Sequence, residues 1–352
     1  MSFWSNPLIA WTEKGLYCQA GDFYIDPHRA VDTALITHAH SDHARRGSKK
    51  YLCTSSGLGL LKSRLGKSIQ AEGIPFQQSF QLGNVKVSFH SAGHILGSAQ
   101  VRVECGSEVW VASGDYKRDP DPSCEPFESV PCHTFITEAT FGTPKYQWKK
   151  DSRHGKDIFD WWMENAEAGR NSLLFGYSLG KAQRILAELA PYAKRPILIH
   201  DSVVDLTECY RREGRILAAT EKLSARVAAG EMAEGELLEG ELLLAPPSIL
   251  KDGWIDRLGD YRTAFASGWM VRSSGGSYGR GSYDHGFVIS DHADWNDLNQ
   301  TIDDCGAERV FVLHREGRLI QHLRKRGLDA HPVSSLTMEN YPRLGGLNLR
   351  LF

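Results

Sequence analysis

The residues best suited to chemistry lie in the segment 38–43, which reads His-Ala-His-Ser-Asp-His and directly follows the apolar run 34–37. A tight turn after a strand can direct His38 and His40 at one metal ion, and Asp42 and His43 at a second ion nearby. Imidazoles and carboxylates bind zinc, and also manganese or iron. The alternative is a histidine-rich surface turn that binds no metal.

Three further residues of ligand type follow predicted strands. His94 comes after the run 85–90, Asp115 after 109–112 and His314 after 310–313. A carboxylate at the position of Asp115 can bridge two cations. Each residue alone is weak evidence, since Gly-Asp is commonly a turn and a histidine behind a strand is commonly structural. Their shared placement favours a dinuclear metal site.

Glu138 and His292 form a candidate acid–base pair. Each lies in a short polar segment, Thr-Glu-Ala-Thr and Ser-Asp-His-Ala-Asp respectively. A carboxylate beside a histidine can select the histidine tautomer and raise its pKa, which suits a general acid. A structural ion pair is an equally good interpretation of these two residues alone.

The elements that must position these residues change in character near residue 150. Residues 1–150 have the pattern of short strands and turns, which favours a layered α/β domain. Beyond it, predicted helices and strands alternate, at 156–167, 172–175, 182–189, 196–199 and 203–212. Such alternation is typical of a parallel sheet. We predict one α/β domain, made of 1–150 and 286–352, interrupted by an insertion at 151–285.

Two stretches of the insertion have a distinct composition. Residues 219–242 are acidic and predicted to be helical, and the Gly/Ser-rich segment 273–282 is the best candidate for a linker.

Composition excludes several classes of protein. Of 352 residues, 41% are hydrophobic and 24% charged, an ordinary globular mixture that argues against disorder and against a fibrous protein. The net charge is −2, so any basic surface for nucleic acid must be local. No apolar run approaches the roughly 18 residues of a membrane-spanning helix. We therefore expect no membrane partner.

The cellular location is expected to be cytoplasmic. The first 15 residues lack a charged leader followed by an apolar segment, so no signal peptide is predicted. The seven cysteines are dispersed and none has CxxC spacing, which fits reduced thiols.

Taken together, these residues resemble the ordered motifs of the metallo-β-lactamase fold, and specifically its β-CASP nuclease branch, over almost the whole chain. Asp26 matches the first motif, 38–43 the second, His94 the third and Asp115 the fourth. The three motifs of the β-CASP group are matched by Glu138, His292 and His314. The resemblance implies an α/β fold, the metallo-β-lactamase αββα sandwich, with an inserted β-CASP α/β domain.

The resemblance also assigns the ligands. It implies two divalent metal ions, zinc or manganese or both. One ion takes His38, His40, His94 and Asp115, and the other takes Asp42, His43, Asp115 and His314. Asp26 is expected to orient the histidine turn rather than to bind metal.

Longer strings resemble the bacterial ligase-associated DNA exonucleases, relatives of the Artemis/Apollo-type DNA nucleases. They are GLYCQAGDFYIDPHRAVDTALITHAHSDHARRGS, TEATFGTPKYQW, LFGYSLGKAQRIL and GFVISDHADW. The resemblance implies a DNA exonuclease that acts on single-stranded ends, with a start at the 5′ end preferred. It also implies a role in DNA repair alongside a DNA ligase and a helicase.

One position departs from the DNA-cleaving pattern. Artemis-type enzymes generally carry an apolar residue where His314 stands, whereas RNA-processing members such as RNase J carry a histidine. Those RNA enzymes usually have glycine next, and here Arg315 follows. The motif leaves DNA and RNA both open, and favours a complete second metal site.

The mechanism expected for this family is attack on phosphorus by a bridging hydroxide. His292, oriented by Glu138, would protonate the leaving 3′-oxygen. The products would carry 5′-phosphate and 3′-hydroxyl ends. Asp42 is expected to be essential for the reaction and dispensable for the fold.

Substrate contacts are predicted at several positions. Ser178 is expected to cap a helix whose N-terminal amides, with Lys181, suit a phosphate, although an ordinary capping turn is equally compatible. Ser267, Gly268 and Trp269 match a family segment near the cleft between the domains. Trp269 could stack on a base or belong to the core.

Basic residues flank the Gly-rich segment and the histidine turn. Arg272 and Arg280 bracket the Gly-rich segment, which could order over a single strand or be a simple linker. Four more basic residues flank the histidine turn and could follow a nucleic-acid backbone or be merely solvated: Arg45, Arg46, Lys49 and Lys50.

Three alternative functions remain. One is an RNase of the RNase J type. Another is a small-molecule metallo-hydrolase, which would not need the inserted domain. The third is a catalytically inactive scaffold, which the complete set of expected ligands argues against.

Overall fold

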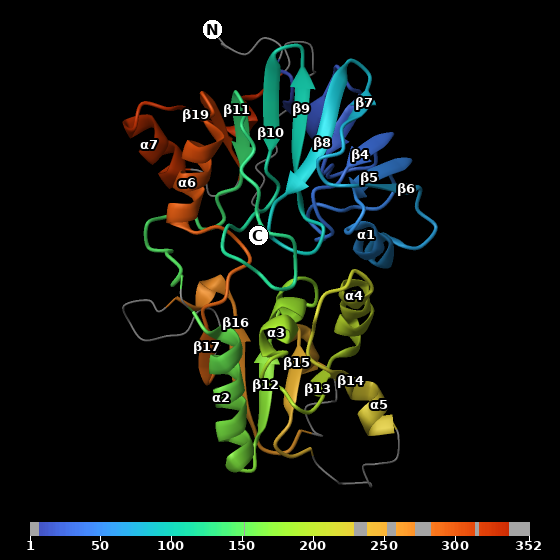
Figure 1. The fold of residues 1–352 in the computed structure, drawn as a ribbon, viewed down its shortest axis with the longest axis vertical. Helices are drawn as coiled ribbons and strands as arrows, with labels where there is room; N and C mark the ends of the chain where they lie inside the picture. Colours follow the sequence, from blue (N-terminus) through green and yellow to red (C-terminus); the bar gives the residue numbers. More distant parts are fainter. Residues whose placement is uncertain are drawn as a thin grey trace.

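The computed structural model describes residues 7–150, 152–228, 238–251, 258–271, 283–313 and 317–337. Within them, three β-sheets are flanked by helices, so the predicted α/β class is confirmed. Two sheets lie in the upper part of Figure 1, and the third lies below them with its own helices.

The first sheet has the order β1-β2-β3-β4-β5-β6. The β1–β2 and β2–β3 pairs are antiparallel, and the pairs from β3 to β6 are parallel. Its strands are β1 (Ala10–Thr12), β2 (Gly15–Cys18), β3 (Phe23–Ile25), β4 (Thr33–Leu35), β5 (Lys50–Thr54) and β6 (Ala71–Ile74), and α1 (Leu58–Leu65) connects the last two.

The second sheet has the order β19-β18-β11-β10-β9-β8-β7 and joins distant parts of the chain. Strands β7 to β10 form antiparallel hairpins, whereas β10, β11, β18 and β19 are parallel. The strands are β7 (Phe80–Leu82), β8 (Val85–Ser91), β9 (Ala99–Cys105), β10 (Glu108–Ala112), β11 (Thr134–Thr137), β18 (Arg309–Val312) and β19 (Asp329–Pro332), with helices α6 (Trp295–Cys305) and α7 (Gly317–Lys325).

The main apolar core lies between these two sheets. Val85, Val87 and Phe89 of β8 are fully buried while Lys86 between them is exposed, the alternation of a strand with one buried face. They belong to one cluster with side chains of the first sheet such as Leu35. Burial of each such side chain contributes about 1.5–3 kcal/mol. This packing fixes the strand ends that carry the site relative to one another.

Helices cover the outer face of each sheet. Leu61 and Leu65 of α1 pack on the first sheet. Leu298 of α6 and Leu319 and Leu323 of α7 pack on the second. A short 3₁₀ turn, Val333–Ser335, follows β19.

The third sheet is wholly parallel and is formed by the chain between β11 and β18. Its order is β14-β13-β15-β12-β16-β17. The strands are β12 (Asn171–Phe175), β13 (Ile197–Ile199), β14 (Thr220–Lys222), β15 (Leu242–Ala245), β16 (Tyr261–Ala266) and β17 (His285–Phe287). The helices are α2 (His154–Glu167), α3 (Lys181–Leu189), α4 (Asp201–Arg212) and α5 (Leu223–Ala228), with 3₁₀ turns at Pro247–Lys251 and Gly268–Met270. β12 is buried along its whole length, as a central parallel strand must be.

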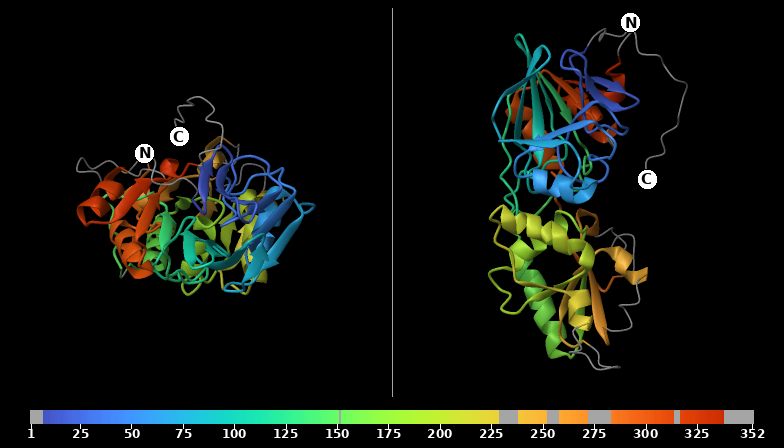
Figure 2. Two further views of the ribbon diagram at one scale, coloured as in Figure 1. Left: turned by 90° about the horizontal axis from the view of Figure 1, so that it is seen from above. Right: turned by 90° about the vertical axis from the view of Figure 1, so that its right-hand side faces the viewer.

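The lower part packs against the upper part through an apolar contact. Leu60 of α1, Ile95 and Leu96 share a cluster with Leu179 and with Tyr210 of α4. Figure 1 and the right-hand view of Figure 2 agree with this, since α1 and α4 face each other across the junction. The third sheet is therefore docked against the edge where the site residues of the other two sheets gather.

Two local predictions are wrong. Ser178 does not cap the helix, because α3 begins at Lys181 with Gly180 at the N-cap and φ of 85°. A Cβ at Gly180 would lie 2.5 Å from Cγ2 of Ile95, so the contact with the upper part requires glycine here. The predicted helix at 219–242 begins instead with β14, which pairs with β13 at the sheet edge, and is helical only at α5 among the described residues.

In the described part of the chain, no helix is both long enough and apolar enough to span a membrane. The proposed linker at 273–282 lies outside the described residues.

Candidate active site

The histidine turn begins just after β4, where the chain leaves the first sheet. The turn closes tightly, since Ala44 N donates to His40 O at 2.8 Å. Gly114, behind β10, approaches Thr37 so closely that a Cβ there would lie 2.7 Å from Thr37 Cβ. With φ of 56°, Gly114 therefore allows the ends of β4 and β10 to meet and brings Asp115 to the turn.

Three imidazoles converge at one point. His38 Nε2 and His94 Nε2 each lie 3.1 Å from His40 Nδ1. These three nitrogens and a carboxylate oxygen of Asp115 all lie within 4.8 Å of one another. The first predicted ligand set is thus brought together by residues from the ends of β4, β8 and β10.

The opposite nitrogen of each ring has its own acceptor. His38 Nδ1 lies 3.1 Å from Thr37 Oγ1, which itself donates to Asp26 at 2.5 Å and so accepts from the ring. His94 Nδ1 donates to Asp291 O at 2.7 Å. His40 Nε2 donates to Leu179 O at 3.1 Å.

These partners select the tautomers. With a proton on each outer nitrogen, the three inner nitrogens carry lone pairs that face one another and cannot hydrogen bond together. Such a buried set is stable when a cation accepts all three lone pairs. The donor set therefore fits a divalent metal ion with His38, His40, His94 and Asp115 as ligands.

Burial reinforces this state. It lowers the pKa of His38 and of His94 well below the usual range and lowers the pKa of His40 as well. These histidines are therefore neutral, as metal ligands must be. Burial alone would raise the pKa of Asp115, but the neighbouring imidazoles, His43 foremost, lower it well below its usual value.

A second group of predicted ligands adjoins the first. His43 Nε2 lies 3.4 Å from Asp115 Oδ2 and 3.7 Å from Asp42 Oδ2. Asp115 Oδ2 is also 3.7 Å from His38 Nε2, so this one carboxylate oxygen faces both groups. His314, the remaining predicted ligand, lies outside the described residues.

Asp26 supports the turn from behind. Its carboxylate accepts from Thr37 N at 2.8 Å and from His43 Nδ1 at 2.7 Å. Its φ is 45°, in the left-handed region that non-glycine residues rarely adopt. A strained backbone at a residue that orients a predicted ligand is typical of a functional site.

Glu138 and His292 lie together beside Asp115. Glu138 is 1% exposed, and its two carboxylate oxygens lie 3.1 and 3.0 Å from His292 Nδ1. Oε1 also accepts from Tyr116 N at 2.8 Å, which holds the carboxylate in place. Burial opposes a charge on His292, but Glu138 outweighs it and raises the pKa of His292 to about 9. The geometry suits a histidine that holds a proton.

The segment carrying His292 is fastened by the N-terminal part of α3. Lys181 Nζ donates to Ile289 O at 2.6 Å and to Asp291 Oδ1 at 2.8 Å. Arg184 donates to Ser290 O and lies 3.5 Å from the Asp291 carboxylate. The third sheet thus positions His292, and also the carbonyl that orients His94.

Lys181 and Ser178 have different partners from the phosphate that we expected. Lys181 is 2% exposed, and its hydrogen bonds are internal. Burial, stronger than the attraction of Asp291, lowers its pKa to about 8. Ser178 Oγ lies 3.0 Å from Ser202 Oγ. This arrangement supports the simple structural interpretation of the turn.

The predicted cleft segment lies in an aromatic cluster next to His292. Trp269 packs on Phe141, with ring centroids 4.4 Å apart, and Phe141 lies 6.0 Å from His292. A Cβ at Gly268 would lie 2.6 Å from the Phe141 ring, so packing requires glycine at this position. Ser267 Oγ accepts from Trp269 N at 3.3 Å and caps the turn.

The other basic residues predicted to contact nucleic acid differ in their surroundings. Arg272 and Arg280 lie outside the described residues. Arg45 and Arg46 are exposed. Lys49 pairs with Asp32 at 2.7 Å, and Lys50 pairs with Glu72 at 3.0 Å.

Asp26 and Glu138 were predicted to act through other residues, but the remaining supports of the site were not. Thr37 and Asp291 adjoin the motifs, so their position was the only available signal. Arg184 and the Leu179 carbonyl carried no signal, because only the docking of the third sheet brings them to the site.

The sequence is 31% identical over 331 residues to a probable DNA ligase of Opitutus terrae, covering 92% of this chain and 31% of that protein. It is 25% identical over 211 residues to an RNase J-like protein of Methanocaldococcus jannaschii, covering 52% of this chain and 50% of that protein. The chain thus spans about a third and about half of the lengths of these relatives.

The fold is similar to that of a solved structure. A protein of unknown function from Enterococcus faecalis aligns with a TM-score of 0.54 and 11% identity, over 80% of this chain and 75% of its own. No family model matches the chain.

Proposed function

The chain belongs to the β-CASP branch of the metallo-β-lactamase-fold nucleases, and from this premise we propose that it is a metal-dependent exonuclease acting on single-stranded ends of DNA. One observation carries the proposal: three histidines, of which His38 and His94 are buried, direct their lone pairs at one point beside Asp115, next to the Glu138–His292 pair. Such a site combines metal ligands with a proton donor, which phosphodiester hydrolysis requires.

The proposal includes the finer architecture. The two packed sheets and their outer helices would form the αββα sandwich, with residues 1–150 and 286–352. The wholly parallel third sheet would be the inserted β-CASP domain at 151–285. The apolar contact between the two parts supports a substrate site at their junction.

The proposed cofactor is a pair of divalent ions, zinc or manganese. His38, His40, His94 and Asp115 would hold one, and Asp42, His43, Asp115 and His314 the other. When bound, two such ions supply a deprotonated water near neutral pH and neutralise charge on the phosphate.

The protein's own residues have complementary tasks. His292, protonated through its contact with Glu138, is placed to donate a proton to the leaving 3′-oxygen. The aromatic cluster around Phe141 shields one side of His292 from water. Lys181 and Arg184 keep the segment that carries His292 in place. The expected products carry 5′-phosphate and 3′-hydroxyl ends.

DNA is favoured over RNA by the relatives. The protein that matches 92% of this chain is named a probable DNA ligase, whereas the RNase J-like match covers 52%. This supports a functional link to a DNA ligase, and with it the expected helicase association and cytoplasmic role in repair. An RNase J-type activity is the second candidate, supported by the histidine at position 314.

The test uses one oligonucleotide sequence made as DNA and as RNA, labelled at either end, with and without a 5′-phosphate. Each is incubated with the wild-type protein or Asp42→Ala, with zinc or manganese. We expect progressive shortening of the single-stranded DNA alone, lost in the variant, with the labelled end that disappears first reporting the polarity.

Other outcomes contradict the proposal in different ways. Preferential cleavage of RNA would assign the protein to the RNA-processing members. Bound metal without cleavage of either polymer would indicate a small-molecule hydrolase. Purification without stoichiometric metal, and no cleavage, would indicate an inactive scaffold.

A further inference from the structure

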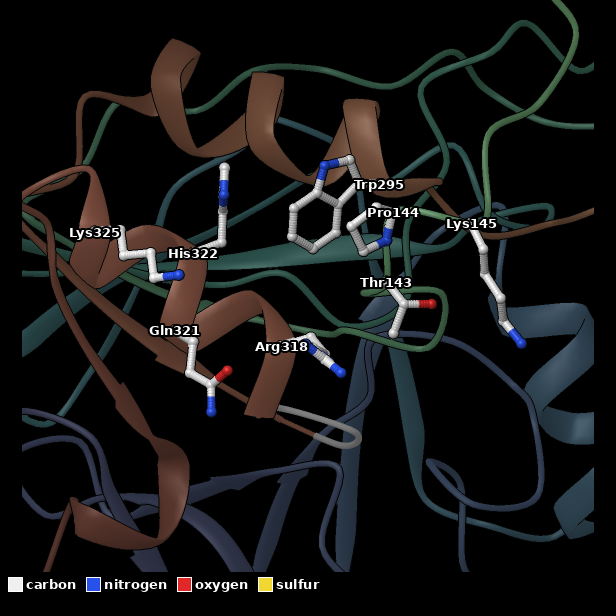
Figure 3. A pocket seen from close by; sticks show the side chains of 8 residues that line it. All are labelled: Thr143, Pro144, Lys145, Trp295, Arg318, Gln321, His322 and Lys325. Atoms are coloured by element: carbon white, nitrogen blue, oxygen red, sulfur yellow. The ribbon is translucent and has the colours of Figure 1, made fainter.

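A pocket of about 560 Å³ lies beside the proposed active site, between the loop that follows Glu138 and the helices α6 and α7. Figure 3 shows its walls. Thr143 and Lys145 come from the loop, Trp295 from the start of α6, and Arg318, His322 and Lys325 from one side of α7. None of the predicted metal ligands or substrate residues is among its lining residues.

The pocket is strongly basic, although the chain has a net charge of −2. Lys145, Arg318 and Lys325 line it, and no carboxylate does so within the described ranges. Neither Arg318 nor Lys325 forms an ion pair with any residue that the structure describes. Unpaired cations that share a pocket repel one another, which an anion in the pocket would relieve.

Two hydrogen bonds join the surroundings of the pocket to the segment that carries His292. Trp295 N donates to Tyr146 O at 3.0 Å, and Trp148 Nε1 donates to His292 O at 3.0 Å. Trp295 is three residues from His292, so their Cα atoms are at most about 11 Å apart. A strand bound with a phosphodiester at His292 can therefore reach the pocket.

The pocket also has an aromatic wall. Trp295 is partly exposed, and its ring meets His322 edge-on with centroids 4.8 Å apart. An exposed aromatic ring among cations is the usual arrangement for binding single strands, because every base has a face that can stack. The volume falls within the roughly 300–1,000 Å³ of small-ligand sites, which suits one or two nucleotides and not a duplex.

We propose that this pocket binds the phosphodiester backbone of a single-stranded nucleic acid that extends from the catalytic centre. The inference rests on the proposed nuclease function and adds a second binding site to it. Arg318 and Lys325 neutralise phosphates, and Trp295 supports a base.

The salt dependence of binding measures these contacts. For single strands, the slope of log K against log salt is about −0.7 for each phosphate neutralised. Removal of both charges should therefore make the slope shallower by about 1.4.

The experiment measures binding of a fluorescent 20-nucleotide DNA by anisotropy, in EDTA so that no cleavage occurs, over a series of salt concentrations. It compares wild type, Arg318→Gln/Lys325→Gln, and the matched control Lys67→Gln/Lys194→Gln. The control removes the same charge from exposed lysines that form no ion pair among the described residues. Lys325→Glu alone serves as a second variant if the double variant does not fold.

We expect the shallower slope only in the pocket variants, with an unchanged melting temperature. Equal slopes in pocket and control variants would overturn the inference, and would leave the nuclease proposal intact if wild type still shortens DNA with metal. A wild-type protein that neither binds nor cleaves any strand would overturn the nuclease proposal, and the pocket inference with it.

Discussion

The Glu138→Gln substitution tests the proton donor most directly. Glu138 is almost wholly buried and faces His292 Nδ1 with both oxygens, at 3.0 and 3.1 Å. Glutamine keeps the shape of the side chain and removes its charge. Since Glu138 is the largest contribution that favours the charged imidazole, its loss should remove most of the elevation in the pKa of His292.

The magnitude follows from the structure. The pKa of His292 rises from an ordinary value of 6.5 to about 9. At about 1.4 kcal/mol per pKa unit, this corresponds to roughly 3 kcal/mol of preference for the protonated form. Because burial acts against the charge and only Asp115 and Asp291 then oppose it, the pKa of His292 in the variant should fall toward 6.5.

The assay is a pH titration of the His292 ring signals by NMR in the metal-free protein. The metal-free state is used because a cation beside Asp115 would repel the proton on His292 and lower its pKa. The raised pKa also contributes stability, which is fully present below pH 6.5 and is lost as the pH rises to about 9. This pH dependence should be much weaker in Glu138→Gln.

The pH dependence of kcat/KM should shift in the same direction as the pKa of His292. In the metal-loaded protein, the alkaline limb of the kcat/KM profile should move to lower pH, with a loss of about 10²–10⁴-fold at the former optimum. An unchanged His292 titration in the variant would refute the reasoning about the pair. An unchanged alkaline limb, with a shifted titration, would show that His292 is not the general acid.

Three further predictions concern neighbouring residues. Asp42→Ala should abolish cleavage and leave the melting temperature unchanged, because the Asp42 side chain is 71% exposed; residual activity near wild type would contradict the metal assignment. Lys181→Met should lower the free energy of unfolding by about 3–5 kcal/mol in denaturant titrations, since Asp291 loses its nearest cation inside the protein; a loss below about 1 kcal/mol would contradict that role. Zinc or manganese at about 100 times the dissociation constant should stabilise wild type by about 2.7 kcal/mol, and His94→Ala should remove most of that gain in a thermal melt.

The sequence was sufficient to predict the ligand cluster. The alternation of polar and apolar residues located the strands, and the ligand types lie directly behind those strands. The ends of β8 and β10 lie at one edge of the second sheet, which places His94 near Asp115, and the packing of the first sheet brings His38 to them. The α/β class followed from the same periodicity, because it depends on local alternation that any segment carries within itself.

Only the tertiary structure decided that Lys181, Arg184 and the Leu179 carbonyl act through other residues of the site. Lys181 has the sequence context of a phosphate ligand, and Asp291 is unremarkable in the chain. The docking of the third sheet buries both and joins them at 2.8 Å, which turns a candidate substrate contact into a support for His292. Likewise, β14 forms although the composition of 219–242 favours a helix. The free edge of the sheet supplies main-chain hydrogen bonds, and the helix propensity of the residues does not include them. Long-range contacts of this kind depend on which surfaces meet, and no local pattern of residue types encodes that meeting.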